Sequence, residues 1–140
     1  VDPVSRRQFW DLIYRLKNEQ RTTVFLTTHY MDEAEHCERV ALIQRGTIAA
    51  IDSPALLKRS IKDAVYVVKG TPFFAIKEAL EQEKEISNVV PFGVSFHIFI
   101  KDRSQASEVK NKLEKNQLRI LRFEPILPSL EDVFISLVQK

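Results

Sequence analysis

One histidine, His29, follows a short apolar run and directly precedes an acidic segment. The run at residues 22–28 has β-branched and aromatic residues on both faces, which is typical of a strand buried inside a parallel sheet. Ligands of open α/β sheets bind beyond the carboxyl ends of such strands. An imidazole there could meet an anionic group of a ligand, although a lone histidine after a strand is more often an ordinary polar loop residue.

Two neighbouring motifs give His29 a context. Residues 22–52 read TTVFLTTHYMDEAEHCERVALIQRGTIAAID, and residues 1–7 read VDPVSRR. The first motif resembles the switch-histidine segment of the ATP-binding subunits of ABC transporters, with its last two core strands at 39–43 and 46–49. The second motif resembles the end of the family's D-loop. The resemblance implies that His29 reaches the terminal phosphate of ATP and that Asp2 touches the partner subunit of a homodimer. Glu38, where many relatives carry aspartate, keeps the charge.

The phosphate-binding part of that family is missing from these 140 residues. It requires a G-x-x-x-x-G-K-[ST] loop, whose backbone N–H groups and lysine hold the phosphates. None of the three glycines, Gly46, Gly70 and Gly93, precedes a lysine. The family's S-G-G-x signature and its strand with the catalytic glutamate are also missing. We therefore expect the C-terminal part of a longer subunit that binds ATP and Mg²⁺, and no nucleotide or metal binding by this chain alone.

Composition excludes few functions but sets limits. The chain has 44% hydrophobic and 29% charged residues, close to globular averages. A net charge of +2 gives no argument for nucleic acid or an anionic membrane as partner. The single cysteine, Cys37, allows no internal disulfide. No apolar run approaches the roughly 18 residues that a bilayer-spanning helix needs. A membrane role would therefore come through a partner.

Local signals divide the first part of the chain into short elements. Asp2 followed by Pro3 is a helix start, with the carboxylate as N-cap. The spacing predicts a helix over 3–19 with a core-facing stripe. Further predictions are a short helix at 31–36, strands at 38–44 and 47–51 joined by a tight turn, and a helix over 54–60. The helix stripe consists of Phe9, Leu12, Ile13 and Leu16.

A second set of strands and helices is predicted after a linker at 60–63. Strands are predicted at 65–69, 88–92, 94–101 and 118–124, and helices at 73–82 and 104–116. This β-α-β-β-α-β order is that of a ferredoxin-like unit. Alternation over 94–101 predicts one apolar sheet face, and Pro91 predicts an edge or a bulge. The expected fold is a C-terminal remnant of a P-loop α/β ATPase domain at 1–62 and a small α+β domain at 63–140.

The chain ends in a motif of its own. Residues 128–134 read PSLEDVF, which resembles the terminus of an ABC subgroup with an added C-terminal domain, often assigned to drug, lipid or polysaccharide export. Ser129 is expected to cap a last helix. Its apolar stripe comprises Leu130, Val133, Phe134, Leu137 and Val138.

Residues 63–140 allow several roles. A ferredoxin-like sheet can bind RNA through aromatic side chains on one face, but Phe96 and Phe99 should point to opposite faces. The other roles are a small-ligand-sensing regulatory module or a dimerisation module that holds two ATP-binding subunits together. His97 is expected to be a solvated strand residue and Cys37 a small half-buried one. Glu33 and Glu35 suit the start of a helix.

The expected function is that of the ATP-hydrolysing subunit of an ABC exporter. Such a subunit is cytoplasmic and lies at the inner face of the cell membrane through membrane-spanning partner subunits. Uncovered apolar surface around 22–28 should recruit other chains, as a dimer or higher oligomer, or leave the first part disordered.

Overall fold

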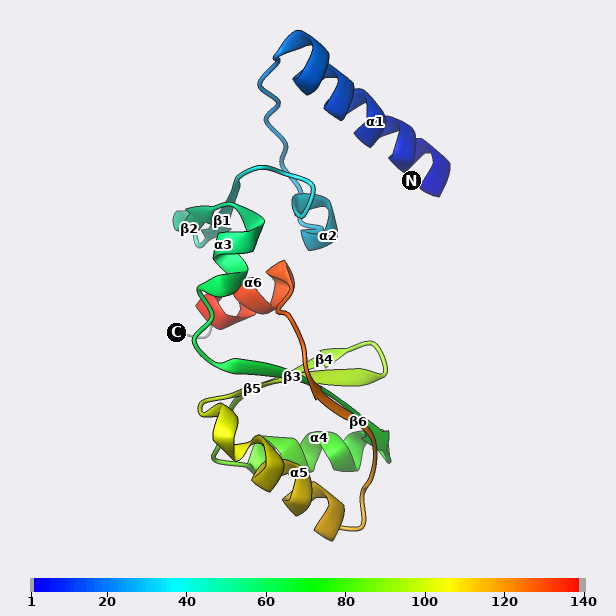
Figure 1. Cartoon of the computed structure of the whole chain (residues 1–140), viewed down its shortest axis with the longest axis vertical. Coiled ribbons are helices and arrows are strands. Elements are labelled where there is room, and N and C mark those ends of the chain that lie inside the picture. The colour runs from blue at the N-terminus through cyan, green and yellow to red at the C-terminus, as the bar shows by residue number, and fades with distance from the viewer. Residues whose placement is uncertain (1, 139–140) are drawn as a thin grey trace.

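The computed structural model describes residues 2–138, so Val1 and residues 139–140 of the two predicted domains lie outside it. Within the described residues there are two sheets, a hairpin and a four-stranded antiparallel sheet, so the architecture is mixed α and β (Figure 1). In chain order the elements are α1 (Pro3–Gln20), α2 (Met31–Ala34), β1 (Val40–Gln44), β2 (Thr47–Asp52), α3 (Pro54–Arg59), β3 (Ala64–Thr71), α4 (Phe73–Gln82), β4 (Ile86–Phe92), β5 (Ser95–Ile100), a 3₁₀ turn (Arg103–Gln105), α5 (Ala106–Lys115), β6 (Arg119–Pro125) and α6 (Leu130–Val138).

The predicted strand at 22–28 is wrong. These residues form neither a helix nor a strand, and the side chain of Phe25 is 93% exposed. A strand needs a hydrogen-bonding neighbour, and β1 and β2 pair only with each other among the described residues. The apolar run therefore has no sheet to join. Figure 1 shows it as an extended link between α1 and α2.

Helix α1 begins as predicted but buries a different face. The Asp2 Oδ1 atom accepts hydrogen bonds from the Val4 and Ser5 amides, which confirms the N-cap. The predicted stripe is not in a core, because Phe9 and Leu12 are exposed. Trp10 is the buried residue of this helix. Ile13 and Leu16 are half-buried, so the described residues cover the apolar stripe only in part.

The β1–β2 hairpin follows from its turn residues. Arg45 and Gly46 have φ angles of 48° and 78°, so both lie in the left-handed region that two-residue hairpin turns use. Val40 and Leu42 of β1 pack with Ala34 and Leu57. Cys37 packs against this cluster, and burial raises the pKa of its thiol.

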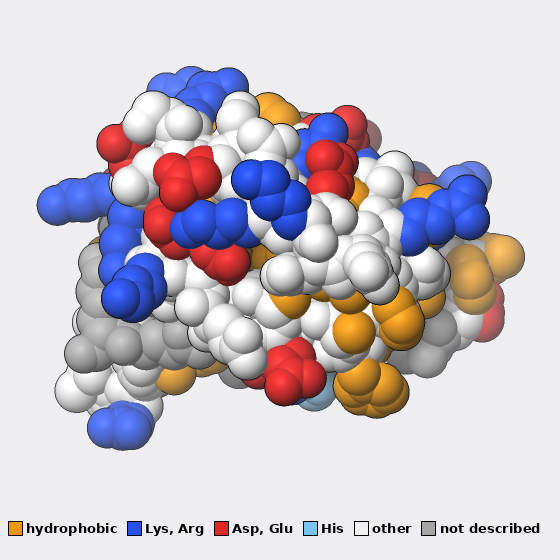
Figure 2. Space-filling view, turned by 90° about the horizontal axis from the view of Figure 1, so that it is seen from below, with side chains coloured by type: hydrophobic (Ala, Val, Ile, Leu, Met, Phe, Trp, Pro, Cys, Tyr) orange, Lys and Arg blue, Asp and Glu red, His pale blue; other side chains and the backbone are white. Residues whose placement is uncertain are grey.

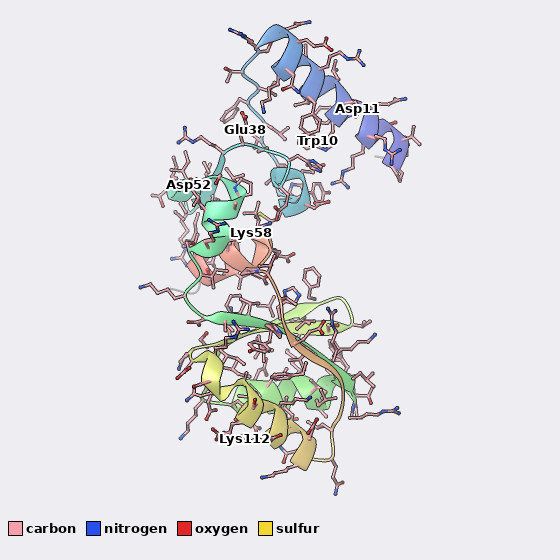
Figure 3. The ribbon with its side chains drawn as sticks, in the orientation of Figure 1. Trp10, Asp11, Glu38, Asp52, Lys58 and Lys112 are labelled. Carbon is pink, nitrogen blue, oxygen red and sulfur yellow. The ribbon has the colours of Figure 1, made fainter. Side chains whose placement is uncertain are left out.

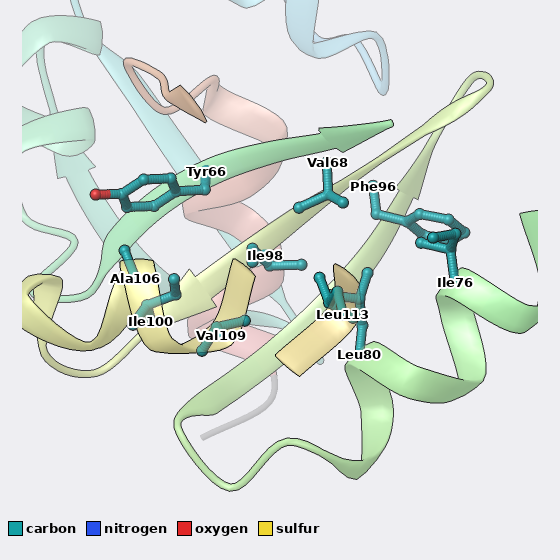
Figure 4. Close-up of a cluster of buried hydrophobic side chains, with 10 residues drawn as sticks. All are labelled: Tyr66, Val68, Ile76, Leu80, Phe96, Ile98, Ile100, Ala106, Val109 and Leu113. Atoms are coloured by element: carbon teal, nitrogen blue, oxygen red, sulfur yellow. The ribbon is translucent and has the colours of Figure 1, made fainter. Parts of the chain in front are cut away.

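The larger sheet has the strand order β4-β5-β3-β6, and every neighbouring pair is antiparallel. Its core lies between the sheet and the helices α4 and α5, where β3 and β5 contribute Val68, Phe96 and Ile98 (Figure 4). Phe96 stacks on Phe73 with ring centroids 4.5 Å apart. β4 is an edge strand, as Pro91 predicted, and its register shift lies at a different place, between Ile86 and Asn88.

The other sheet face is also apolar, contrary to the prediction of a single apolar face. Phe99 is buried there with Val65 and Val90, against Ile126 and Ile135. His97 is 7% exposed rather than solvated. Helix α6 contributes Ile135 to this face, and alternation within β5 gives no sign of a helix arriving from 35 residues away. Phe96 and Phe99 point to opposite faces, as predicted, and both are buried.

The outer side of α4 and α5 carries intermixed acidic and basic side chains (Figure 2). Lys112 of α5 lies 3.1 Å from Glu83 and 3.0 Å from Glu85. Hydrogen bonding to Glu85 and Glu83 raises the pKa of Lys112, and the bond from Lys112 lowers the pKa of Glu85. The contribution of these pairs to the free energy of unfolding is therefore present between the ordinary pKa values of glutamate and lysine. It is lost as pH falls through the pKa of Glu85 or rises through that of Lys112.

Gly70 is required by packing at the β3–β6 pairing. A Cβ atom on Gly70 would lie 2.6 Å from the Arg119 carbonyl oxygen and 2.9 Å from Ile76 Cδ1. We expect Gly70→Ala to lower the free energy of unfolding by about 1–3 kcal/mol, the usual cost of overpacking. Urea denaturation measures this. Gly93→Ala serves as the comparison for backbone strain without overpacking, since its Cβ would meet open space but its φ of 59° is strained for alanine. A free energy of unfolding for Gly70→Ala equal to that of the unaltered chain would contradict the steric argument.

Candidate functional site

His29 lies in the turn that precedes α2. Its side chain is exposed, and its ring centroid is 4.1 Å from that of Tyr30. The Tyr30 carbonyl oxygen accepts hydrogen bonds from the Glu33 and Ala34 amides, which starts the helix. The imidazole therefore stands just before a helix N-terminus, open to solvent. An exposed imidazole in such a turn can approach an anionic group of a ligand.

Side chains that the sequence did not single out hold this turn. The Thr28 hydroxyl donates to Glu33 Oε2 at 2.6 Å and accepts from the Tyr30 amide at 3.0 Å. Glu33 Oε1 accepts from Arg6 of α1 at 3.2 Å. Glu33 thus does more than suit the helix start, because it joins the turn to α1. The sequence gives little sign of the Thr28–Glu33 bond, since both residue types are common near helix starts.

A groove of about 480 Å³ separates α1 from α2, lined by Arg6, Trp10, Asp32 and His36 among others. Trp10 points from α1 toward the segment after α2 (Figure 3) and stacks on His36 with ring centroids 4.6 Å apart. The Tyr14 hydroxyl lies 2.9 Å from His36 Nδ1. Arg6 also pairs with Asp32 at 3.0 Å. These contacts tie α1 to the segment that carries His29.

Asp2, the second predicted site residue, lies at the N-terminus of α1 and does not contact His29. Its Oδ2 atom accepts from the Ser5 hydroxyl at 2.6 Å. The hydrogen bonds from Ser5 and Val4 lower the pKa of Asp2. The cap is therefore fully ionised above the ordinary pKa of aspartate and is lost as pH falls through the lowered value. Asp2 is exposed.

Residues 2–138 offer neither a cluster of metal ligands nor a membrane-spanning helix. No group of three or more His, Cys, Asp or Glu side chains is placed to hold a metal ion within this range. None of the helices in the same range has the length and apolar character to cross a bilayer.

Comparison with known proteins places the chain in a family. Residues 53–138 match the family described as "ATP-binding protein DrrA1-3-like, C-terminal domain". The chain is 48% identical over 58 residues to the probable multidrug ABC transporter ATP-binding protein YbhF of Escherichia coli, covering 41% of the chain and 10% of that protein. It is 30% identical over 147 residues to the daunorubicin/doxorubicin resistance ATP-binding protein DrrA of Streptomyces peucetius, covering 98% of the chain and 43% of that protein.

Plant proteins extend the likeness. ABC transporter A family member 7 of Arabidopsis thaliana is 33% identical over 150 residues, which covers 99% of the chain and 16% of that protein. The chain thus spans less than half the length of each of these relatives. The likeness covers the His29 segment as well as the C-terminal sheet, because two of the alignments run over nearly all of the chain. The chain belongs to the ATP-binding proteins of ABC transporters, and residues 53–138 are their DrrA1-3-like C-terminal domain.

Proposed function

We propose that these residues are part of the ATP-hydrolysing subunit of an ABC exporter, in which His29 donates a hydrogen bond to the terminal phosphate of ATP. The supporting observation is the position of His29, exposed in a turn that Thr28 and Glu33 hold at the start of α2. A preorganised donor of this kind stabilises negative charge that develops during phosphoryl transfer. No group of His, Cys, Asp or Glu side chains within residues 2–138 is placed to hold the Mg²⁺ of that reaction.

The proposed subunit works as a homodimer at the inner face of the cell membrane. Asp2 is proposed to contact the partner subunit, and the membrane-spanning subunits would carry the transported compound. Relatives named for multidrug transport and for daunorubicin/doxorubicin resistance support an exporter of drug-like compounds. The exposed residues Val24 and Phe25 support burial against further protein in the assembled subunit.

A nucleotide titration tests whether these 140 residues bind ATP without the phosphate-binding loop. The 140 residues contain no phosphate-binding loop, so we expect Mg-ATP to give no specific heat of binding in isothermal calorimetry. A longer protein that carries these residues after such a loop should bind and hydrolyse ATP. A stoichiometric micromolar site on the 140-residue chain would contradict the expectation that ATP binding requires the phosphate-binding loop.

We propose a domain boundary after residue 62, with a ferredoxin-like unit beyond it. The strand order β4-β5-β3-β6 with α4 and α5 on one face supports this topology. The role proposed for residues 63–140 is to hold two ATP-binding subunits together. The edge strands β4 and β6 of the sheet support this role, because they carry the exposed apolar residues Phe92 and Leu121, which a second subunit could cover.

A shortened chain tests the boundary. The main core of the sheet draws only on residues 64–123, so a chain starting at Ser60 should fold and melt cooperatively. Helix α6 should be loosened in it, because Leu130 and Val133 pack on residues of the first part. Amide dispersion in NMR spectra and thermal melting followed by circular dichroism measure both effects. A molten product would place the boundary elsewhere.

A further inference from the structure

Helix α6 packs on both parts of the chain. Its residues Leu130 and Val133 are fully buried with Ala34 and Leu57 of the first part. On its other side, Ile135 packs against the sheet residues Val65 and Phe99. Figure 1 shows α6 between α3 and the four-stranded sheet. Whatever holds α6 in place therefore also sets the distance between α2 and the sheet.

A buried carboxylate fixes α6 to the sheet. Asp132 is 1% exposed, and its Oδ1 atom lies 2.9 Å from Nδ1 of His97 on β5. Its Oδ2 atom accepts from the Ser129 amide at 2.8 Å and from the Ser129 hydroxyl at 3.0 Å. The Asp132 amide donates back to the Ser129 hydroxyl at 3.1 Å, which completes a capping box. A carboxylate only accepts, so His97 Nδ1 carries the proton of this bond.

A second carboxylate fixes α6 to the segment after α2. Glu35 Oε1 accepts from the Leu130 amide at 3.4 Å, at the start of α6. Glu35 Oε2 pairs with Lys58 of α3 at 2.6 Å. Lys58 is labelled on α3 in Figure 3. Glu35 directly follows α2, and Asp132 lies two residues after Leu130, in the same first turn of α6. The first turn of α6 is thus held from both sides.

We propose that Asp132 and Glu35 are positioning residues that hold α6 between β5 and α2. Through them the C-terminal sheet fixes the position of α2 and of His29, which lies two residues before that helix. The part of this proposal that concerns His29 rests on the function proposed above. The mechanical part rests only on the contacts of α6.

Hydrogen exchange in the whole 140-residue chain tests the mechanical part. His97→Leu removes the bond to Asp132, whereas His97→Asn keeps a donor close to the position of Nδ1. We expect His97→Leu to raise the exchange rates of the Ala34 and Glu35 amides, which bond to Tyr30 and Met31, at least fivefold more than those of α5. His97→Asn should restore most of the protection. If the exchange rates in α2 and α5 rose by the same factor, the variant would only be destabilised globally, and the proposal would be overturned.

A Glu35 variant provides a second test of the mechanical part. Glu35→Gln keeps the side-chain shape but removes the charge that pairs with Lys58. It should raise the exchange rates of the same α2 amides. Because both changes loosen the same helix, the double variant with His97→Leu should show less than the product of the two separate factors. Simple multiplication of the factors would overturn the proposal.

Turnover in a longer ATP-hydrolysing protein tests the link to His29. There His97→Leu should lower kcat several-fold and leave ATP affinity unchanged. An unchanged kcat together with faster α2 exchange would overturn the link to His29. If the unaltered longer protein hydrolysed no ATP, the proposed function would fail, and the exchange result would still decide the mechanical part.

Discussion

His29→Ala is expected to lower kcat for ATP hydrolysis by a factor on the order of 10² to 10³ in a longer protein that carries the phosphate-binding loop, the size typical of losing one preorganised donor. ATP affinity should change little, because His29 meets charge that develops only in the transition state. Steady-state turnover and nucleotide titration separate the two quantities.

The control for this experiment is Lys115→Ala. Lys115 is exposed at the end of α5, on the far side of the sheet from His29. The Lys115→Ala variant should therefore leave turnover unchanged. His97 is unsuitable as a control, because its bond to Asp132 is buried. If His29→Ala kept more than about half of the turnover while the protein stayed folded, the proposed role of His29 would fail.

Phe96→Ala is expected to lower the free energy of unfolding by about 3–5 kcal/mol, the usual cost of removing a large buried aromatic side chain. Phe96 is 1% exposed and packs between the sheet and α4, where it stacks on Phe73. The alanine would leave a cavity that strands β3 and β5 cannot close. Urea denaturation followed by circular dichroism measures the change.

Phe74→Ala is the matched control. Phe74 also contacts Phe73, at 5.5 Å between ring centroids, but its side chain is 80% exposed. Surface changes of this kind usually stay within about 0.5 kcal/mol. Similar losses for the two variants would contradict the assignment of Phe96 to the main core.

Elements with a strong local signal were predicted well. Helix α4 spans the predicted residues 73–82, since an apolar period of 3.6 over ten residues leaves little choice. The Asp2 cap and the Arg45–Gly46 turn were also predicted, because a cap or a two-residue turn depends only on its immediate neighbours. The family resemblance rested on short motifs of the same local kind, and the match over residues 53–138 confirms it.

Predictions failed where a side chain's surroundings come from a distant segment. Residues 22–28 have the composition of a buried strand, but a strand exists only when another strand supplies its hydrogen bonds. His97 alternates with apolar residues, which predicts a solvent-exposed side chain. Asp132, 35 residues later, buries it instead.

The local elements of this protein, the motif around His29 and the family can all be inferred from the amino-acid sequence. Those properties depend on residues within one or two turns of each other. Three contacts between distant segments become visible only in the folded chain: α6 packs on both parts, His97 pairs with Asp132, and Glu35 meets the start of α6. The reason is physical: periodicity tells which face of an element is apolar, but which element covers that face depends on how the whole chain packs.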